Sequence, residues 1–255
     1  MKNLIGISGH IGSGKDTVGT IIQYLQEESE WNNFDDFVAN SYPELASEWK
    51  IRKFADKLKD IVCMLIGCTR EQLEDQIFKN TVLPDAWNRY TVIYNNKTQF
   101  IGTKKEAEKV FNDYIFNLKI NSGHIKIENS HITPRLLLQL LGTDCCRNII
   151  NENIWVNALM VDYVGEYDLI SDRTTYPNWI ITDMRFPNEM EAVKERKGIT
   201  IRVSRTGIHT PKLEDLHPSE TALDDAEFDY VIINNGTIED LIEKVREILI
   251  NEKIL

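Results

Sequence analysis

The first seventeen residues constrain the fold of this chain more than any other segment. An apolar run, Leu4–Ile7, leads into the sequence Ser-Gly-His-Ile-Gly-Ser-Gly-Lys-Asp-Thr, which ends at Thr17. Gly9, Gly14 and Lys15 have the spacing of a phosphate-binding P-loop. Its glycines let backbone amides turn toward phosphate oxygens, and the helix that follows points its N-terminus at the anion. We therefore expect a strand, a loop and a helix that bind a nucleoside triphosphate. A glycine-rich turn with an unrelated lysine is the alternative.

Charge and composition exclude several classes of protein. The chain has 255 residues, with 29 basic and 40 acidic side chains and a net charge of −11. This balance argues against bulk binding to nucleic acid or to an anionic membrane surface. No apolar stretch approaches the roughly 18 residues of a membrane span, and Met1-Lys2-Asn3 leads straight into the first strand. We therefore expect a cytoplasmic protein without a signal peptide. The cysteines form no Cys-x-x-Cys pair and should be reduced: Cys63, Cys68, Cys145 and Cys146.

Apolar runs and helical periodicity alternate along the chain, which predicts an α/β fold with a parallel sheet covered on both faces. The expected strands are Leu4–Ile7, Lys50–Phe54, Trp179–Thr182, Thr200–Val203 and Tyr230–Ile233. The expected helices are Lys15–Glu28, Ala55–Ile66, Pro134–Leu141, Ile154–Val164, Asn188–Arg196 and Ile238–Ile250. The length suits one α/β domain with an inserted subdomain.

Two stretches interrupt this alternation. The first, Pro84–Ser130, has weak periodicity, although Thr91–Tyr94 and Gln99–Ile101 around Asn95-Asn96 could form a hairpin. The second, Ser204–Asp225, is a polar segment between two core strands, and a loop of that length is often a lid. A tolerated surface insertion is the alternative for both.

The segment Trp-Ile-Ile-Thr-Asp-Met-Arg at 179–185 predicts a second part of the site. A buried strand that ends at Asp183 places a carboxylate at the carboxyl edge of the sheet, where parallel sheets bind ligands. There Asp183 could hold Mg²⁺ directly or through water, and Arg185 could meet a transferring phosphoryl group with its planar fork. The alternative is a surface turn in which Asp183 caps the next helix.

Three further features carry polar groups toward the same region. Arg202 and Arg205 would bring cations near the far side of the nucleotide, and the turn Asn234-Asn235-Gly236 could rest against a base. The alternative is an ordinary turn, because Asn and Gly are common turn residues. Arg135 and Gln139 are four residues apart and share one face of a helix that we expect to end at Gly142-Thr143. They would suit an anion and a base edge, with solvated surface residues as the alternative.

Together, these motifs resemble those of phage-type deoxynucleoside monophosphate kinases, as in T4-like phages. The motifs, in chain order, are Gly-Ser-Gly-Lys-Asp-Thr at 12–17, Phe-Ala-Asp-Lys-Leu-Lys at 54–59, Leu-Leu-Gly-Thr-Asp at 140–144, Trp155-Val156, Asp-Met-Arg-Phe-Pro-Asn-Glu at 183–189, Arg-Val-Ser-Arg-Thr-Gly at 202–207, His-Pro-Ser-Glu at 217–220 and the Asn-Asn-Gly turn. Their shared order is more specific than any single one, and the resemblance spans nearly the whole chain apart from Pro84–Ser130.

The resemblance implies a three-layer P-loop kinase fold with a parallel five-stranded sheet. In a single domain over 1–255, the core would be 1–54 and 178–255, a monophosphate-binding insertion would be 55–177, and the lid would be about 204–225. The implied reaction moves the γ-phosphoryl group of ATP, with Mg²⁺, to a deoxynucleoside 5′-monophosphate. Its implied partners are this substrate and no nucleic acid or membrane. A homodimer formed through the insertion is an open alternative that no residue supports.

The resemblance also assigns residues to roles. The expected catalytic residues are Lys15, Asp183, Arg185 and Arg205, and the expected metal ligands are Thr17 and Asp183. The expected ATP contacts are Gly9, Gly12, Ser13, Gly14, Lys15, Asp16, Thr17, Asn235 and Gly236. The expected monophosphate contacts are the cations Lys59, Arg70 and Arg135, with Gln139, Asp144 and Trp155 around base and sugar. Lys79 lies near a basic position of the family without matching it cleanly, and Arg147 has no secure counterpart.

Two questions stay open at this stage. Asp16 stands where P-loops usually carry Ser or Thr, so the role of the hydroxyl passes to Thr17 or to water-mediated Mg²⁺ binding. The activity itself has two rivals. One is another small-molecule kinase on the same scaffold, such as a phosphomevalonate or dephospho-coenzyme A kinase. The other is a P-loop protein that binds nucleotides without transferring phosphate.

Overall fold

Five parallel strands form the central sheet of the computed structural model, which describes residues 2–41, 47–118, 125–170, 172–206 and 221–255. The strands are β1 (Leu4–Ser8), β2 (Trp49–Arg52), β8 (Asn178–Ile181), β9 (Ile199–Ser204) and β10 (Tyr230–Ile233). Their order across the sheet is β10-β9-β1-β8-β2, and every neighbouring pair is parallel. This confirms the predicted α/β class and the five-stranded parallel sheet, with strand ends shifted by up to two residues from those expected.

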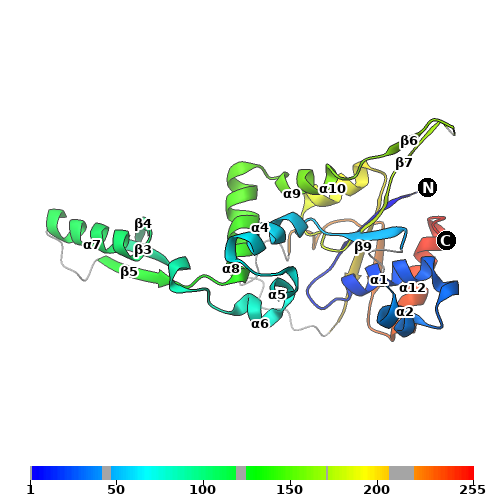
Figure 1. Cartoon of the computed structure of the whole chain (residues 1–255), viewed down its shortest axis with the longest axis horizontal. Helices are drawn as coiled ribbons and strands as arrows, with labels where there is room; N and C mark the ends of the chain where they lie inside the picture. Colours follow the sequence, from blue (N-terminus) through cyan, green and yellow to red (C-terminus); the bar gives the residue numbers. More distant parts are fainter. Residues whose placement is uncertain (1, 42–46, 119–124, 171, 207–220) are drawn as a thin grey trace. The chain divides into compact units, whose positions relative to one another are not determined.

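Helices cover both faces of this sheet, because alternate residues of each strand point to opposite sides. On one face, Ile5 and Ile7 of β1 belong to a buried cluster with α1 (Lys15–Gln26), α2 (Phe34–Asn40) and α12 (Ile238–Asn251). On the other face, Leu4 belongs to a cluster with α9 (Ile154–Met160) and α10 (Pro187–Glu195). Figure 1 shows α1 and α12 on one side of the strands and α9 and α10 on the other. The result is a three-layer core.

The chain divides into two compact units, residues 1–57 with 151–255 and residues 58–150. The first contains the five-stranded sheet. The helices of the second are α5 (Arg70–Glu74), α6 (Gln76–Asn80), α7 (Lys104–Leu118), α8 (Pro134–Gln139) and the π-helical segment η4 (Leu140–Ile150), while α4 (Asp56–Ile66) runs from the end of the first unit into the second. Residues 55–57 and 151–177, which we expected in the insertion, fall in the first of these units, and the single domain with an insertion stays a prediction.

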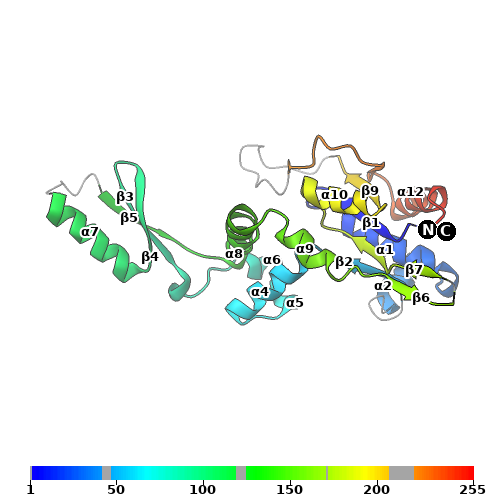
Figure 2. The same ribbon diagram turned by 90° about the horizontal axis from the view of Figure 1, so that it is seen from above.

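The stretch without recognised motifs forms a small sheet. Strands β3 (Arg89–Tyr94), β4 (Lys97–Gly102) and β5 (Ile125–Ser130) pair antiparallel in the order β4-β3-β5. Asn95 and Asn96 both have positive φ, 49° and 59°, as a two-residue hairpin turn that follows the strand twist requires. The predicted hairpin is therefore confirmed. Helix α7 lies alongside these strands (Figure 2). Ala107 of α7 and Val92 of β3 belong to one buried cluster.

The helix that carries Arg135 does not end where we predicted. Helical turns continue from α8 through η4 to Ile150, so Gly142 lies inside the helical run and does not cap it. The reason is close packing, because a Cβ on Gly142 would come 2.8 Å from Cδ2 of Leu58. This glycine serves a close approach to α4, so the prediction that Gly142-Thr143 ends the helix was wrong.

The remaining elements are short. Strands β6 (Glu166–Asp168) and β7 (Arg173–Thr175) form a hairpin that the sequence did not reveal, and the helix predicted over Ile154–Val164 ends at Met160. The short 3₁₀ turns are η1 (Glu28–Glu30) and η2 (Asp85–Trp87). Among the described residues, no helix has both the length and the apolar character to cross a membrane.

Candidate nucleotide and phosphate sites

The P-loop joins β1 to α1 through glycines that no other residue could replace without strain. A Cβ on Gly9 would come 2.5 Å from the carbonyl oxygen of Val203, and Gly12 and Gly14 have φ values of 81° and 96°. The amide of Ser13 donates to the carbonyl of His10 at 3.1 Å and tightens the loop. Helix α1 begins directly after Gly14, so its N-terminus faces the space in front of the loop, where an anion is stabilised.

A residue to which the sequence analysis gave no role donates a hydrogen bond to the P-loop. Asn234, which follows β10, donates from its amide nitrogen to the carbonyl of Ser13 at 2.9 Å. Its backbone amide donates to Ser204 at 2.7 Å, which ties the end of β10 to β9. A Cβ on Gly14 would come 2.4 Å from Nδ2 of Asn234. The Asn-Asn-Gly turn was the available signal, but it pointed us to Asn235.

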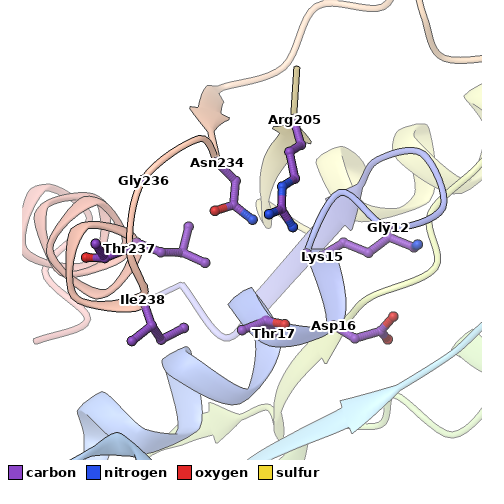
Figure 3. A pocket seen from close by; sticks show the side chains of 11 residues that line it. Gly12, Lys15, Asp16, Thr17, Arg205, Asn234, Gly236, Thr237 and Ile238 are labelled. Atoms are coloured by element: carbon purple, nitrogen blue, oxygen red, sulfur yellow. The ribbon is translucent and has the colours of Figure 1, made fainter. Parts of the chain in front are cut away.

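A pocket of about 430 Å³ opens in front of the P-loop (Figure 3). Its walls combine the loop, the first turn of α1, Arg205 after β9 and the turn that starts α12. The lining residues are Gly12, Gly14, Lys15, Asp16, Thr17, Arg205, Asn234, Gly236, Thr237, Ile238 and Leu241. The structure therefore brings Lys15, Thr17, Arg205 and Gly236 to one pocket. Asn235 accepts a hydrogen bond from the amide of Thr206 at 2.9 Å and is not among the lining residues.

Asp16 is already engaged by two side chains outside the loop. Its Oδ1 accepts a hydrogen bond from the hydroxyl of Thr182 at 2.8 Å and lies 2.9 Å from the ammonium of Lys53. Desolvation raises the pKa of Asp16, but the hydrogen bonds and positive charge of Lys53, together with Thr182, outweigh it and hold the pKa below its usual value. Asp16 thus links the P-loop to β2 and β8. Sequence reasoning missed Lys53, because nothing local places it beside the loop.

Asp183 anchors the chain where it leaves the sheet. Its two carboxylate oxygens accept hydrogen bonds from the amides of Phe54 at 2.8 Å and Ala55 at 3.0 Å. Burial raises the pKa of Asp183, and the amides of Ala55 and Phe54 offset only part of that effect. The alternative of a helix cap is not what the structure shows for α10. The buried carboxylate of Glu189 takes that role and accepts from the amides of Arg185 at 2.7 Å and Phe186 at 3.1 Å.

The described part of the expected lid begins and ends beside the P-loop strand. Arg202 donates to the hydroxyl of Ser8 at 3.0 Å and pairs with Asp224, whose carboxylate also lies 3.2 Å from Nε2 of His10. Residues 207–220, which include the His-Pro-Ser-Glu motif, lie outside the described residues. Arg202 therefore links Asp224, near the end of the expected lid, to Ser8 of β1.

In the second unit, cations from three helices meet at one carboxylate. Lys59 of α4 lies 2.5 Å from Oε1 of Glu74, and Lys79 of α6 lies 3.1 Å from Oε2. Arg70 of α5 lies 3.8 Å from Oε1 of Glu74 and 3.0 Å from Asp60. We call Lys59, Arg70, Lys79 and Glu74 the cation cluster. The structure thus brings together two of the cations expected at the acceptor phosphate and adds Lys79, which the sequence left unassigned.

The other residues expected around the acceptor occupy separate positions. Arg135 of α8 donates to Oδ1 of Asn80 at 2.9 Å and to Oε1 of Gln76 at 2.8 Å, so neutral amides of α6 hold it. Gln139 at the end of α8 is half-buried, and Asp144 in η4 is exposed. Trp155 of α9 is only 5% exposed and belongs to the first unit.

Comparison with known proteins decides the family. A family model described as deoxynucleotide monophosphate kinase matches residues 3–245. The chain belongs to this family. The deoxynucleoside-5′-monophosphate kinase of Escherichia phage T5 is 28% identical over 240 residues, which cover 88% of this chain and 86% of that protein. The deoxynucleotide monophosphate kinase of Enterobacteria phage T4 is 32% identical over 144 residues, 56% of each chain. A putative deoxynucleotide monophosphate kinase of Acanthamoeba polyphaga mimivirus is 33% identical over 121 residues, 44% of this chain and 59% of that one.

Membership in the deoxynucleotide monophosphate kinase family confirms the resemblance that the motifs suggested. It also implies a nucleotide substrate. The family match spans both units, and residues 84–130, where no motif was recognised, lie within it.

Magnesium fits this pocket only as a partner of phosphate. No group of three or more His, Cys, Asp or Glu among the described residues could hold a metal ion alone. Mg²⁺ in kinases needs few protein ligands, because substrate phosphates and water complete its octahedron. Asp16 and Thr17 both line the pocket, and Asp16 also contacts Lys53 and Thr182. The lining would therefore suit an Mg²⁺ that phosphate and water also hold, with the hydroxyl of Thr17 as one available ligand.

Proposed function

We propose that this protein transfers the γ-phosphoryl group of ATP to a deoxynucleoside 5′-monophosphate and so supplies deoxynucleoside diphosphates for DNA synthesis. The observation that carries the proposal is a P-loop pocket with Lys15 and Arg205 in its wall, in a chain of the deoxynucleotide monophosphate kinase family. The names of the phage T5 and T4 relatives support the acceptor class. For a phage-encoded enzyme, the place of action would be the host cytoplasm.

The transfer needs alignment and charge more than covalent chemistry. An oxygen of the acceptor phosphate attacks the γ-phosphorus, the bond to the β–γ bridging oxygen breaks, and ADP leaves with that oxygen. Negative charge spreads over the transferring group, where preorganised cations stabilise it. Lys15, Arg185 and Arg205 would supply that charge, and no general base is required. Thr17, with Asp183 through water, would hold Mg²⁺, which neutralises the charge of the β- and γ-phosphates when bound.

The acceptor would be held by the second unit. Lys59, Arg70 and Arg135 are proposed to bind its 5′-phosphate, and the contacts of Lys59 and Arg70 with one carboxylate support an anion site there. Gln139 and Asp144 of this unit are proposed to contact the base and sugar, whereas Trp155, which belongs to the first unit, stays a prediction from the family resemblance. The amides that hold Arg135 orient its guanidinium without neutralising it, which suits a group that must receive a phosphate.

A coupled assay that reports ADP tests the proposal directly. ATP is offered with each deoxy- and ribonucleoside monophosphate, including a hydroxymethylated pyrimidine, and with phosphomevalonate and dephospho-coenzyme A. We expect turnover that depends on an added deoxynucleoside monophosphate and disappears in Lys15→Ala. Turnover only with a non-nucleotide acceptor would replace this function by one of its rivals, and ATP binding without turnover on any acceptor would leave a nucleotide-binding protein.

A further inference from the structure

Glu74 occupies the centre of the cation cluster in the way that an anionic ligand would. Its Oε1 contacts Lys59 at 2.5 Å and Arg70 at 3.8 Å, and its Oε2 contacts Lys79 at 3.1 Å. Three cations from α4, α5 and α6 therefore converge on the two oxygens of one carboxylate. Asp60 pairs with Arg70 at 3.0 Å, so Glu74 and Asp60 together balance two of these three charges, and an anion of higher charge than a carboxylate fits the cluster.

Burial differs sharply between the carboxylate and its lysine partners. The side chains of Lys59 and Lys79 are 14% and 13% exposed, whereas that of Glu74 is 47% exposed. Desolvated ammonium groups need an anionic partner, because burial disfavours their charged form. Glu74 also lies at the last position of α5, directly before the extended residue Asp75 that separates α5 from α6. Glu74 is thus the most exposed side chain of the cation cluster and the one best placed to turn toward water.

Glu74 is charged at neutral pH. Burial works against its ionised form, but hydrogen bonds and charge from Lys59 and Lys79 lower the pKa of Glu74 to about 2. The carboxylate therefore reduces the repulsion between the two lysines at neutral pH. A competing anion must offer more charge or more oxygens than a carboxylate in order to replace it.

We propose that Glu74 is an internal counter-ion that takes the place of the acceptor's phosphate among Lys59, Arg70 and Lys79 and is displaced when that phosphate binds. The proposal rests on the proposed function, which supplies the ligand. A phosphate dianion brings twice the charge and three terminal oxygens, so it gains more from three cations than a carboxylate does. Glu74 thereby keeps the buried lysines paired in the unloaded protein and sets a requirement for a dianionic acceptor. It acts as a specificity-determining residue and makes no bond to the substrate.

Removing this charge should strengthen acceptor binding. We expect Glu74→Gln to lower the dissociation constant of the best deoxynucleoside monophosphate by roughly three- to tenfold, since the phosphate no longer competes with an ion pair. Isothermal titration measures this, with ATP as a second ligand whose affinity should stay unchanged. Glu71→Gln is the matched control, because it removes the same charge from the same short helix at an exposed position.

Thermal denaturation gives an independent measurement. Without ligand, Glu74→Gln should be less stable than the wild type, because two buried ammonium groups lose their partner. Inorganic phosphate should then raise its melting temperature more than that of the wild type. Glu74→Asp, which keeps the charge on a shorter stem, should fall between the two in both measurements and serves if the glutamine variant does not fold.

The outcomes separate this proposal from the function on which it rests. If the wild type binds no deoxynucleoside monophosphate, both are overturned. If the wild type binds it and Arg135→Ala loses affinity, but Glu74→Gln binds equally or more weakly, only the displacement proposal is overturned. Glu74 would then position the cations in the complex. Equal gains in Glu74→Gln and Glu71→Gln would also overturn it, because the effect would be one of general charge.

Discussion

The P-loop pocket and the cation cluster both gather positive groups suited to phosphate, but they are built from different parts of the chain. In the P-loop, backbone conformation does most of the work: Gly12 and Gly14 take positive φ, and the amides and the start of α1 face the pocket. The loop adds two charged side chains to the pocket, Asp16 and Lys15, the latter at 8% exposure. Residues 12–17 supply one wall of this site, and Arg205 with residues between 234 and 241 supply the rest.

The cation cluster uses side chains alone. Its members come from three helices, and their charges would repel one another without the carboxylate of Glu74. A backbone site carries only partial charges and can stand empty at little cost, whereas a site of desolvated side-chain cations requires a counter-ion before the ligand arrives. Each site contains a carboxylate: Asp16 beside Lys53 in the wall of the P-loop pocket, and Glu74 between the cations of the cluster.

The largest expected effect is on kcat in a variant of the P-loop, and it tests whether the two sites have different functions. Lys15→Ala should reduce kcat by roughly 10²–10³-fold, because a preorganised charge on the transferring phosphoryl group is lost. Binding of the monophosphate should be unchanged, since its proposed cations lie in the other unit. Steady-state kinetics and titration measure both, with the exposed Lys97→Ala as control. Comparable activity in Lys15→Ala would remove the P-loop from the mechanism.

Arg185 tests whether a second side chain of the sheet edge belongs with the P-loop. Arg185→Lys should lower kcat by roughly 10–100-fold with little change in KM, because a point charge does not reproduce a bidentate fork on a transferring group. Initial rates over a range of both substrates separate the two parameters. A rise in KM alone would mean that Arg185 binds phosphate in the ground state.

Arg135 tests the proposed acceptor site, as Lys15 tests the P-loop pocket. Arg135→Ala should weaken binding of the deoxynucleoside monophosphate by about 1.5–3 kcal/mol, the scale of hydrogen bonds to charged groups, and leave ATP affinity unchanged. Titration with each nucleotide separately measures this, and the exposed Arg173→Ala controls for loss of a surface charge. Equal losses for both nucleotides would indicate general damage, and no loss for either would return Arg135 to the solvated surface.

Two glycines differ in what an added Cβ would meet: a backbone oxygen at Gly9 and a side chain at Gly142. In Gly9→Ala the new Cβ meets the carbonyl oxygen of Val203, and we expect a loss of about 2–3 kcal/mol in unfolding free energy. In Gly142→Ala the nearest atom is the end of the Leu58 side chain, and alanine favours helical backbone, so the change should stay within about 1 kcal/mol of zero. Urea unfolding compares them. Equal losses would show that the Leu58 side chain cannot move away from a Cβ on residue 142.

The smallest effect concerns acid stability. The pKa of Glu74 is lowered from 4.5 to about 2, so its contribution is present above pH 4.5 and is lost as pH falls toward 2. Between pH 5 and 3, the wild type should lose on the order of 1 kcal/mol more than Glu74→Gln, a value reduced by screening of this half-exposed group. Urea unfolding at several pH values measures the difference, which should shrink in salt. Parallel curves for the two proteins would show that Glu74 adds no pH-dependent stability.

The sequence predicted most of the sheet but little of the second unit. Strands of the core are short apolar runs whose neighbours in a parallel sheet are buried on both faces, and this pattern is legible without tertiary contacts. Helix α7 was missed although Val110, Phe111, Tyr114 and Ile115 recur at helical spacing, and strand β5 was missed because few of its residues are apolar. The hairpin of β3 and β4 was found through the turn at Asn95-Asn96. The helix end expected at Gly142 was wrong, because the sequence does not distinguish a glycine that allows close packing from one that caps a helix.

The sequence by itself determined the P-loop, the α/β class and the family, because each depends on residues that are consecutive or recur in a fixed order. The tertiary structure decided which distant side chains meet: Lys53 at Asp16, Asn234 at Ser13, and Lys79 beside Lys59 at Glu74. Backbone conformation follows from local residue types, and a motif can encode it. Contacts between charged side chains depend on how separate helices and strands pack, so no stretch of this sequence contains them.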